Sequence, residues 1–430
     1  MSVDRSKAPE THEFPYRKIP AERTLVTDGR VTVHIIDRGD IPVGRVDIMY
    51  MYGSRHSTVQ LGSATYANAL APMLLEGTKD MDSAALAEVF DFAGAEVQAA
   101  ASETALRVSV TSLNESTPDL LRTLATVINN AALPADKFGI IALQALQKFE
   151  ISQTQPARIA ADRLRTVMAG EGHPYLRAAR RSDFTDLSHD SLVTAWQTAT
   201  AHTDLHIFFS GKLTADLEEA LTDLARALRP TPATDLYTVP VTPMSALPPV
   251  TEHIDMPQSL QTAICAGIPT IGREHPDYIP LRLTVMALGG YFGSRLMTNI
   301  REEKGLTYGI SAALLGTYEG AYAMISAQCA AGTGELVLGE IKSELTKLAE
   351  DGMGADELRR LRQYAASQLM GTLDTPMAIA DYYINRLSVG TPADYFGAQQ
   401  RAIAALDSPT LRRMAATYLR PERLRTVTCG

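Results

Sequence analysis

One order of strand-like and helix-like segments occurs twice in this chain, once on each side of a proline-rich stretch. Before that stretch, "RVTVHIID" and "RVDIMYMYG" alternate like strands, and "TYANALAPMLLEG" and "SAALAEVFDFAG" have the spacing of helices. The second of these helices has Ser83 as its predicted N-cap and Gly94 beyond its end. A strand, "TALRVSVTSL", and a helix, "TPDLLRTLATVINNA", complete the first series.

After the proline-rich stretch the strand "LQTAICAGIP", the helical "YIPLRLTVMALGG" and "SRLMTNIREEKG", the strands "YGISAALL" and "GAYAMISAQC", and the amphipathic "ELVLGEIKSELTKLAEDG" follow. Two unrelated α/β domains are the alternative, but the recurrence favours two copies of one α+β domain. We therefore predict a first domain at 1–228, a linker at 229–257 and a second domain at 258–430. Short connections such as "GTYE" predict a mainly antiparallel sheet covered by helices in each domain.

Charge and apolar patterning exclude several classes of protein. The formal net charge is −9 and the basic residues are not clustered, which disfavours nucleic acid and anionic membrane surfaces as partners. The N-terminus lacks the apolar core of a secretory signal, and no apolar run has the length of a membrane span. Three cysteines without close spacing argue against a disulfide framework or a cysteine-ligated zinc. The sequence predicts a cytoplasmic protein.

The stretch "LGGYFGSRLMTNIREEKGLTYGISA" resembles the second domain of the insulinase/pitrilysin-like zinc peptidases, the inverzincins. "MYGSRH", "LLEGTKDMDSAALAEVFDFAGAEV", "HPYLRAA" and "LRRLRQYAASQLMGTLDTPMAIADYYINRL" fall where that family has corresponding segments, so the likeness covers nearly the whole chain. The resemblance implies two homologous α+β domains that form half of a clamshell chamber with a second such pair. Active members hydrolyse unstructured peptides there, using a zinc held by H-x-x-E-H and a later glutamate.

The zinc motif is missing from the corresponding helix. Anchored on "GT", the segment "NALAPMLLEGT" has Asn68, Ala71 and Pro72 in place of the histidine, glutamate and histidine of the motif. Alanine cannot deprotonate water, proline has no imidazole, and asparagine is a poor zinc ligand. Glu150 lies about where the later glutamate is expected, but one carboxylate does not hold zinc. We therefore predict no metal and no cofactor in this chain.

No other histidine pair replaces the motif. Of the nine histidines, only His202 and His206 have the i, i+4 spacing, and "HTDLHIFFSG" indicates a loop entering a strand, where these positions lie about 13 Å apart. Active members also have an Asn-Ala-x-Thr strand that aligns peptide, whereas this chain has Gln98, Ala99 and Ala101 at those places. We infer that the chain by itself does not cleave peptide bonds.

Arg301 and Tyr308 lie on either side of Gly305, in a segment predicted to end a helix and begin a strand. Taken alone, Arg301 could be part of a solvated helix end and Tyr308 a half-buried strand residue. In the resembled family this pair faces the zinc from the opposite domain, so it can serve a zinc that another chain holds. A tyrosine hydroxyl can donate to an oxyanion, and a guanidinium can hold a substrate carbonyl or carboxylate.

Three functions follow from these observations. The leading hypothesis is the non-zinc subunit of a heterodimeric peptidase, which closes the chamber and supplies Arg301 and Tyr308 to a homologous partner that holds zinc through H-x-x-E-H. The alternative is a catalytically inactive structural or peptide-holding protein of the same fold, possible as a homodimer. A peptidase that acts alone is contradicted by Asn68, Ala71 and Pro72. Retention of the arginine and tyrosine favours the first hypothesis, because a structural relic does not need them.

Overall fold

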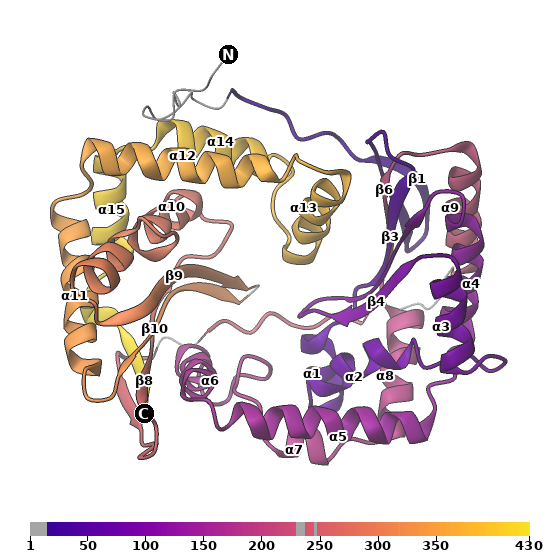
Figure 1. Cartoon of the computed structure of the whole chain (residues 1–430), viewed down its shortest axis with the longest axis horizontal. Helices are drawn as coiled ribbons and strands as arrows, with labels where there is room; N and C mark the ends of the chain where they lie inside the picture. The colour runs from indigo at the N-terminus through magenta and orange to yellow at the C-terminus, as the bar shows by residue number, and fades with distance from the viewer. Residues whose placement is uncertain (1–14, 229–236, 245–246, 318) are drawn as a thin grey trace, which may run out of the picture.

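The computed structural model describes residues 15–228, 237–244, 247–317 and 319–430, and Figure 1 shows two sheets on opposite sides of the molecule. Parts of the predicted linker, 229–236 and 245–246, lie outside the described residues. In the first half the elements are β1 (Arg23–Asp28), β2 (Val31–Asp37), β3 (Val43–Tyr50), α1 (Ser54–Leu61), α2 (Thr65–Met73), α3 (Ser83–Phe92), β4 (Glu96–Ala101), β5 (Leu106–Leu113), α4 (Thr117–Asn129), α5 (Ala135–Ser152), α6 (Pro156–Ala169), α7 (Ser182–Thr185), α8 (His189–His202), β6 (Leu205–Gly211) and α9 (Ala215–Ala227).

The second half has the same general order as the first: strands, then helices, a hairpin, several more helices and a further strand. Its elements are β7 (Thr251–Ile254), β8 (Gln261–Thr270), α10 (Tyr278–Gly289), the π-helix η1 (Met297–Glu303), β9 (Thr307–Thr317), β10 (Gly320–Ala330), α11 (Gly334–Glu350), α12 (Ala355–Gly371), α13 (Pro376–Val389), α14 (Tyr395–Ala405), α15 (Ser408–Tyr418), the 3-10 helix η2 (Pro421–Arg423) and β11 (Arg425–Cys429).

Both sheets are mainly antiparallel, as the sequence predicts. The first has the strand order β1-β2-β6-β3-β5-β4 and the second β7-β11-β8-β10-β9. One pair in each sheet is parallel, β2 with β6 and β7 with β11, because each of these strands returns through helices rather than a hairpin. The fold class is therefore α+β with two similar domains.

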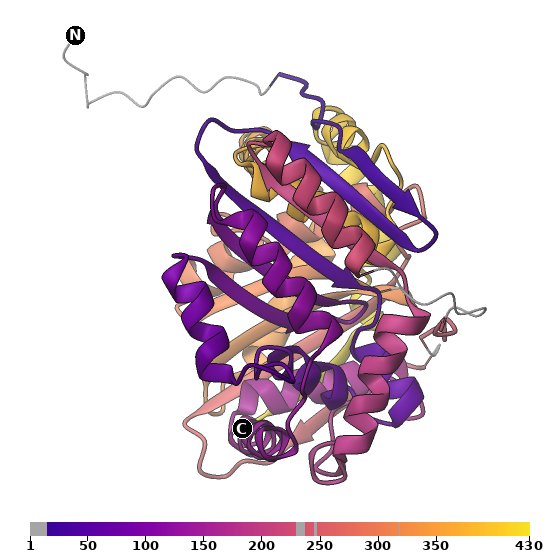
Figure 2. The same ribbon diagram turned by 90° about the vertical axis from the view of Figure 1, so that its right-hand side faces the viewer.

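Each sheet is covered on its outer face by helices of its own half. Alternate residues of β2 and β6 pack with α2, α4, α8 and α9 into one core, and Figure 2 shows helices of this layer in front of the strands. In the second half, α10, α11 and α15 pack against β8 and β10 in the same way. Gly289 permits the close approach of α10 to β9, since a Cβ at that position would lie 2.6 Å from the backbone nitrogen of Ala312.

The inner face of each sheet is covered by a helix from the other half. Leu164 and Met168 of α6 pack on Cys265 and Val427 in the second sheet. Conversely, Ile379, Ala380 and Tyr383 of α13 pack on Ile36, Met49 and Phe208 in the first sheet. This exchange of α6 and α13 buries apolar side chains from both halves in shared clusters, which stabilises their relative orientation. None of the helices that the structure describes has the length and apolar character needed to cross a bilayer.

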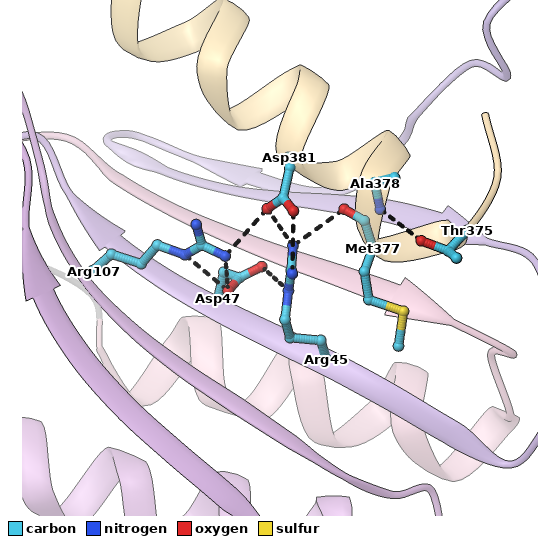
Figure 3. A network of polar contacts seen from close by, with 7 residues as sticks. All are labelled: Arg45, Asp47, Arg107, Thr375, Met377, Ala378 and Asp381. Carbon is cyan, nitrogen blue, oxygen red and sulfur yellow. Dashed lines mark hydrogen bonds and ion pairs between the residues drawn. The ribbon is translucent and has the colours of Figure 1, made fainter. Parts of the chain in front are cut away.

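A network of charges also fastens α13 to the first sheet (Figure 3). The fully buried Asp47 of β3 accepts hydrogen bonds from Arg45 at 3.0 Å and from Arg107 at 2.7 Å. The same two arginines reach Asp381 of α13, with Arg45 at 2.6 Å and Arg107 at 3.4 Å. Asp47 thus holds both guanidinium groups in position for Asp381.

The tip of the β9–β10 hairpin forms a second contact between the halves. The side chain of Glu319 is fully buried there, 3.1 Å from Arg55 of α1, and it accepts a hydrogen bond of 2.6 Å from the hydroxyl of Tyr175. Arg55 also donates to the carbonyl of Val239 in the linker. An ion pair with so little solvent contact depends on both partners, so the hairpin tip and the first half position each other.

Two half-buried histidines, His56 and His206, are expected to make the fold sensitive to acid. Burial, and then the nearby Arg55 charge, lowers the pKa of His56 to about 4. Burial, and then His34, lowers the pKa of His206 to about 4, against a smaller opposing effect of Glu22. Below about pH 6.5 the unfolded chain takes up protons at these histidines while the folded chain does not, so the stability present above that pH is lost as the pH falls toward 4.

At pH 5 we expect each of these two histidines to reduce the free energy of unfolding by about 1–2 kcal/mol relative to pH 7.5. The measurement is the melting temperature between pH 7.5 and 5. His206→Gln should flatten the dependence, and an unchanged slope in that variant would contradict the assignment.

Candidate functional site

The segment that lacks the zinc motif lines a cavity of about 760 Å³ in the first half. Asn68 and Pro72 of α2 are exposed on the cavity side, whereas Ala71 is 1% exposed. Pro72 has no N–H to donate to the carbonyl of Asn68, and α2 ends at Met73, one residue later. Pro72 therefore stands in the last turn of α2, where the missing N–H costs a single helical hydrogen bond.

Helix α5 forms the opposite wall of the cavity, and its orientation corrects the sequence-based position of the third ligand. Gln144 and Lys148 line the cavity, but Glu150 does not. The carboxylate of Glu150 instead lies 3.0 Å from the guanidinium of Arg181 on the protein surface. A lysine thus stands on the cavity wall of α5, where an ammonium group repels a metal cation.

The remaining charges of the cavity do not favour zinc either. Its lining includes four basic residues and one acidic residue, Asp183. Asp183 is committed to a two-point ion pair with Arg177, with distances of 2.6 and 2.7 Å. Within the residues that the structure describes, no three His, Cys, Asp or Glu side chains form a group that could hold a metal ion. The residues of this chain therefore do not fit a zinc ion.

The purified chain is expected to hold less than stoichiometric zinc after dialysis, because the cavity offers neither ligands nor negative charge. Elemental analysis of dialysed protein measures this directly. About one retained zinc per chain, resistant to a weak chelator, would disprove the expectation.

The peptide-aligning strand of the resembled family corresponds to β4, which forms an edge of the first sheet. Gln98 donates a hydrogen bond of 2.5 Å to Glu96 two residues earlier, so its amide is engaged within the strand. Ala99 and Ala101 are half-buried and have no polar side-chain atoms. The side chains of β4 therefore lack the asparagine and threonine that align a peptide in the resembled family. The backbone of β4 pairs with β5 on one side only, so its other side could still pair with a peptide.

The structure brings Arg301 and Tyr308 together in the second half. Arg301 lies in η1, Gly305 adopts a positive φ of 63°, and Tyr308 is the second residue of β9. The Nε of Arg301 donates a hydrogen bond of 3.1 Å to the carbonyl oxygen of Tyr308. The predicted turn from helix into strand is confirmed, with the difference that the helix is a π-helix, a form frequent at functional sites.

The exposure of Tyr308, beside a half-buried Arg301, argues against a packing role for the tyrosine. Tyr308 is 94% exposed, so it is not the half-buried strand residue that was one interpretation of the sequence. The guanidinium of Arg301 lies 4.7 Å from the centre of the Phe292 ring, and Phe292 is itself 61% exposed. Cation–π stacking and the backbone hydrogen bond together fix the plane of the guanidinium at the surface. Sequence reasoning missed Phe292, because only the fold shows which aromatic ring reaches Arg301.

The neighbours of the pair are held against α11 by one ion pair at the surface and one buried hydrogen bond. Lys304, which follows η1, forms an ion pair with Glu340 of α11. Asn299 donates a hydrogen bond of 2.8 Å to Glu344 on the same helix. These contacts anchor η1 to α11 on one side and leave the side that carries Arg301 and Tyr308 facing solvent.

Two family models match the sequence. The model for insulinase, peptidase family M16, matches residues 44–173, and the model for the peptidase M16 inactive domain matches residues 186–364. No curated protein matches the sequence.

Several solved structures share the fold. A peptidase M16 inactive domain from Pseudomonas fluorescens is 24% identical, with a TM-score of 0.85 over 95% of this chain and 98% of that one. A protease from Helicobacter pylori is 16% identical, with a TM-score of 0.87 over 96% and 100% of the two chains. The periplasmic protease PqqL from Escherichia coli is 14% identical, with a TM-score of 0.77, and the match covers 99% of this chain but 49% of PqqL.

Proposed function

The chain belongs to the insulinase-like M16 peptidase family, and from this premise we propose that it is the non-zinc subunit of a heterodimeric peptidase. The observation that carries the proposal is the solvent-facing pair of Arg301 and Tyr308, held in one orientation by a backbone hydrogen bond and by Phe292. A side chain as exposed as Tyr308 contributes little to folding, so its use lies in contact with another molecule.

The chemistry of the pair suits a peptide that is being hydrolysed. The hydroxyl of Tyr308 is a neutral donor, able to bind the oxyanion that develops on the scissile carbonyl. The Nε of Arg301 is occupied by the backbone, which leaves its two amino groups directed elsewhere for a substrate carbonyl or carboxylate. The zinc of the partner chain would supply the activated water, while this chain holds and polarises the peptide.

Two further observations favour a partner of the same fold. PqqL is about twice as long as this chain, so a single polypeptide there has room for a second unit of this size. On α5, Ile140, Leu143 and Ile151 are exposed along one face of the helix. Such an apolar surface stripe is typical of a protein contact.

The experiment that tests the proposal combines the chain with a homologous H-x-x-E-H protein from the same source. We expect a one-to-one complex in size-exclusion chromatography and cleavage of a quenched fluorescent peptide by the mixture but not by this chain. A stable homodimer that ignores the zinc protein would instead support the structural or peptide-holding alternative. Whether the complex acts in the cytoplasm, as the sequence predicts, is decided by fractionation.

A further inference from the structure

A second cavity, of about 520 Å³, lies in the second half between α10, β9, α12, α13 and α14. Its place in the fold parallels that of the cavity beside α2 and α5. In each half, one of the helices that precede the hairpin and the second helix after the hairpin form its walls, α2 with α5 and α10 with α12. The two cavities differ in their chemistry.

The lining of the second cavity is basic and contains no acidic residue. Three arginines face it, Arg273, Arg282 and Arg386. Within the described part of the chain, none of the three forms an ion pair with a carboxylate. The guanidinium of Arg386 instead lies 5.8 Å from the ring centre of Tyr383. Three cations in one cavity repel each other unless an anion joins them.

Two of these arginines have one amino group of the guanidinium fixed by a hydrogen bond within the protein. Arg273 donates a hydrogen bond of 3.0 Å to the carbonyl of Gly316, and Arg282 donates one of 2.6 Å to the side chain of Gln399, which is 4% exposed. Gly316 is needed for this arrangement, because a Cβ there would lie 3.0 Å from Nε of Arg273 and 2.7 Å from the hydroxyl of Tyr278. The guanidinium groups are therefore pre-positioned before any ligand binds.

Donor atoms of three cavity residues have no acceptor. The Nε atoms of Arg273 and Arg282 are buried and lack a hydrogen-bond partner within the described residues, and the buried hydroxyl of Tyr382, which the backbone of Phe396 approaches as a donor, has no acceptor there. Buried polar atoms in folded proteins are nearly always paired, with protein groups or with water, so a group of three in one cavity favours an acceptor from outside the fold. The side chains of Gln368 and Asn385 offer further amide donors in the same lining.

Arg273 acts electrostatically on Glu103, but this acid does not lie in the cavity. Burial, and then Glu319, raises the pKa of Glu103, while Arg273 is one of three arginines that oppose the rise. Glu103 is not part of the cavity lining, and its own Oε1 is buried without a partner. The arginines of the cavity consequently keep their capacity for an anion.

We propose that this cavity binds an oxyanion, a carboxylate or a phosphate, carried by a small organic molecule or a peptide end. The arginines provide charge-assisted hydrogen bonds, and the hydroxyl of Tyr382 provides a neutral one. Val285, Leu314 and Tyr364 supply apolar and aromatic wall for the body of the ligand. The inference goes beyond the peptidase role and is independent of Arg301 and Tyr308, because binding is measured on this chain by itself.

The test is calorimetric titration of the full chain in a phosphate-free buffer at constant ionic strength. Two probes distinguish the source of the oxyanion: inorganic phosphate, and an acetylated tripeptide compared as free acid and as amide. Binding of phosphate assigns the cavity to phosphate-bearing molecules, and binding of the free acid but not the amide assigns it to peptide ends. Absence of binding for both probes overturns the proposal.

Variants locate the binding to this cavity. Arg282→Gln is expected to weaken binding at least about tenfold. Tyr382→Phe removes one hydroxyl that has no acceptor, without emptying space, so it should weaken binding severalfold and leave the melting temperature of the free chain unchanged. The matched control is Arg359→Gln, which removes an exposed arginine that pairs with Asp356 on α12. Equal affinity in Tyr382→Phe, Arg282→Gln and the control would overturn the assignment.

Discussion

Replacing Tyr308 by phenylalanine is expected to lower kcat of the two-chain peptidase by about 10²-fold while leaving the complex assembled. The change removes one hydroxyl from a side chain that is 94% exposed, so neither the fold nor the pairing of β9 with β10 depends on it. The loss falls on kcat because an oxyanion donor acts in the transition state rather than on bound substrate. Steady-state cleavage of a quenched fluorescent peptide measures it.

Arg301→Ala provides the contrasting variant. A guanidinium that holds substrate before reaction contributes to ground-state binding, so its loss should raise KM as well as lower kcat. Arg359→Gln, an exposed arginine of the same half, is the control and should leave both constants unchanged. Wild-type rates from an intact Tyr308→Phe complex would remove the catalytic role and leave the structural subunit as the better interpretation.

Replacing Asp47 by asparagine is expected to destabilise the protein by about 3–5 kcal/mol, the usual cost of breaking a buried ion pair by removing one partner. Asp47 is fully buried and contacts both Arg45 and Arg107, so its loss leaves these half-buried arginines with only the exposed carboxylate of Asp381 and puts an amide in place of their buried partner. The single tryptophan, Trp196 of α8, packs edge-on against Tyr50, with ring centres 5.5 Å apart. Tyr50 lies on β3, the strand that also carries Asp47. Urea unfolding followed by the tryptophan fluorescence reports on this sheet.

Asp381→Asn is the matched control, because Asp381 contacts the same two arginines but its side chain is 51% exposed. Exposed ion pairs contribute less than about 1 kcal/mol, so this variant should be nearly as stable as the wild type. If the two variants were equally stable, the burial of Asp47 would not be what makes the network strong.

Several features of the chain follow from short stretches of sequence. The loss of the zinc motif is a matter of residue identity, and no packing can turn Asn68, Ala71 and Pro72 into a zinc site. The turn between Arg301 and Tyr308 depends on Gly305, whose positive φ few other residues adopt. The hairpin of β9 and β10 was also predictable, because the period-2 pattern of its strands and its short connection are local features of the sequence.

Helix boundaries and faces were less predictable, even where the helices themselves were expected. The N-cap of α3 is Asp82 rather than the predicted Ser83, because its carboxylate accepts a hydrogen bond from the N–H of Ala85. The prediction that Glu150 lies at the place of the later zinc-binding glutamate was also wrong. Packing against α2 and α7 sets the rotation of α5 and turns Lys148, not Glu150, toward the cavity.

The recurring series of strands and helices, the missing zinc ligands and the local geometry of the Arg301 and Tyr308 turn could be predicted from the amino-acid sequence, since each depends on residues close together in the chain. The exchange of α6 and α13, the Asp47 network and the basic cavity of the second half are visible only in the folded protein. Asp47 and Asp381 are more than 300 positions apart, and Arg282 and Gln399 more than 100. Contacts over such separations leave no periodicity in the sequence, because they form only when both halves have folded and packed against each other.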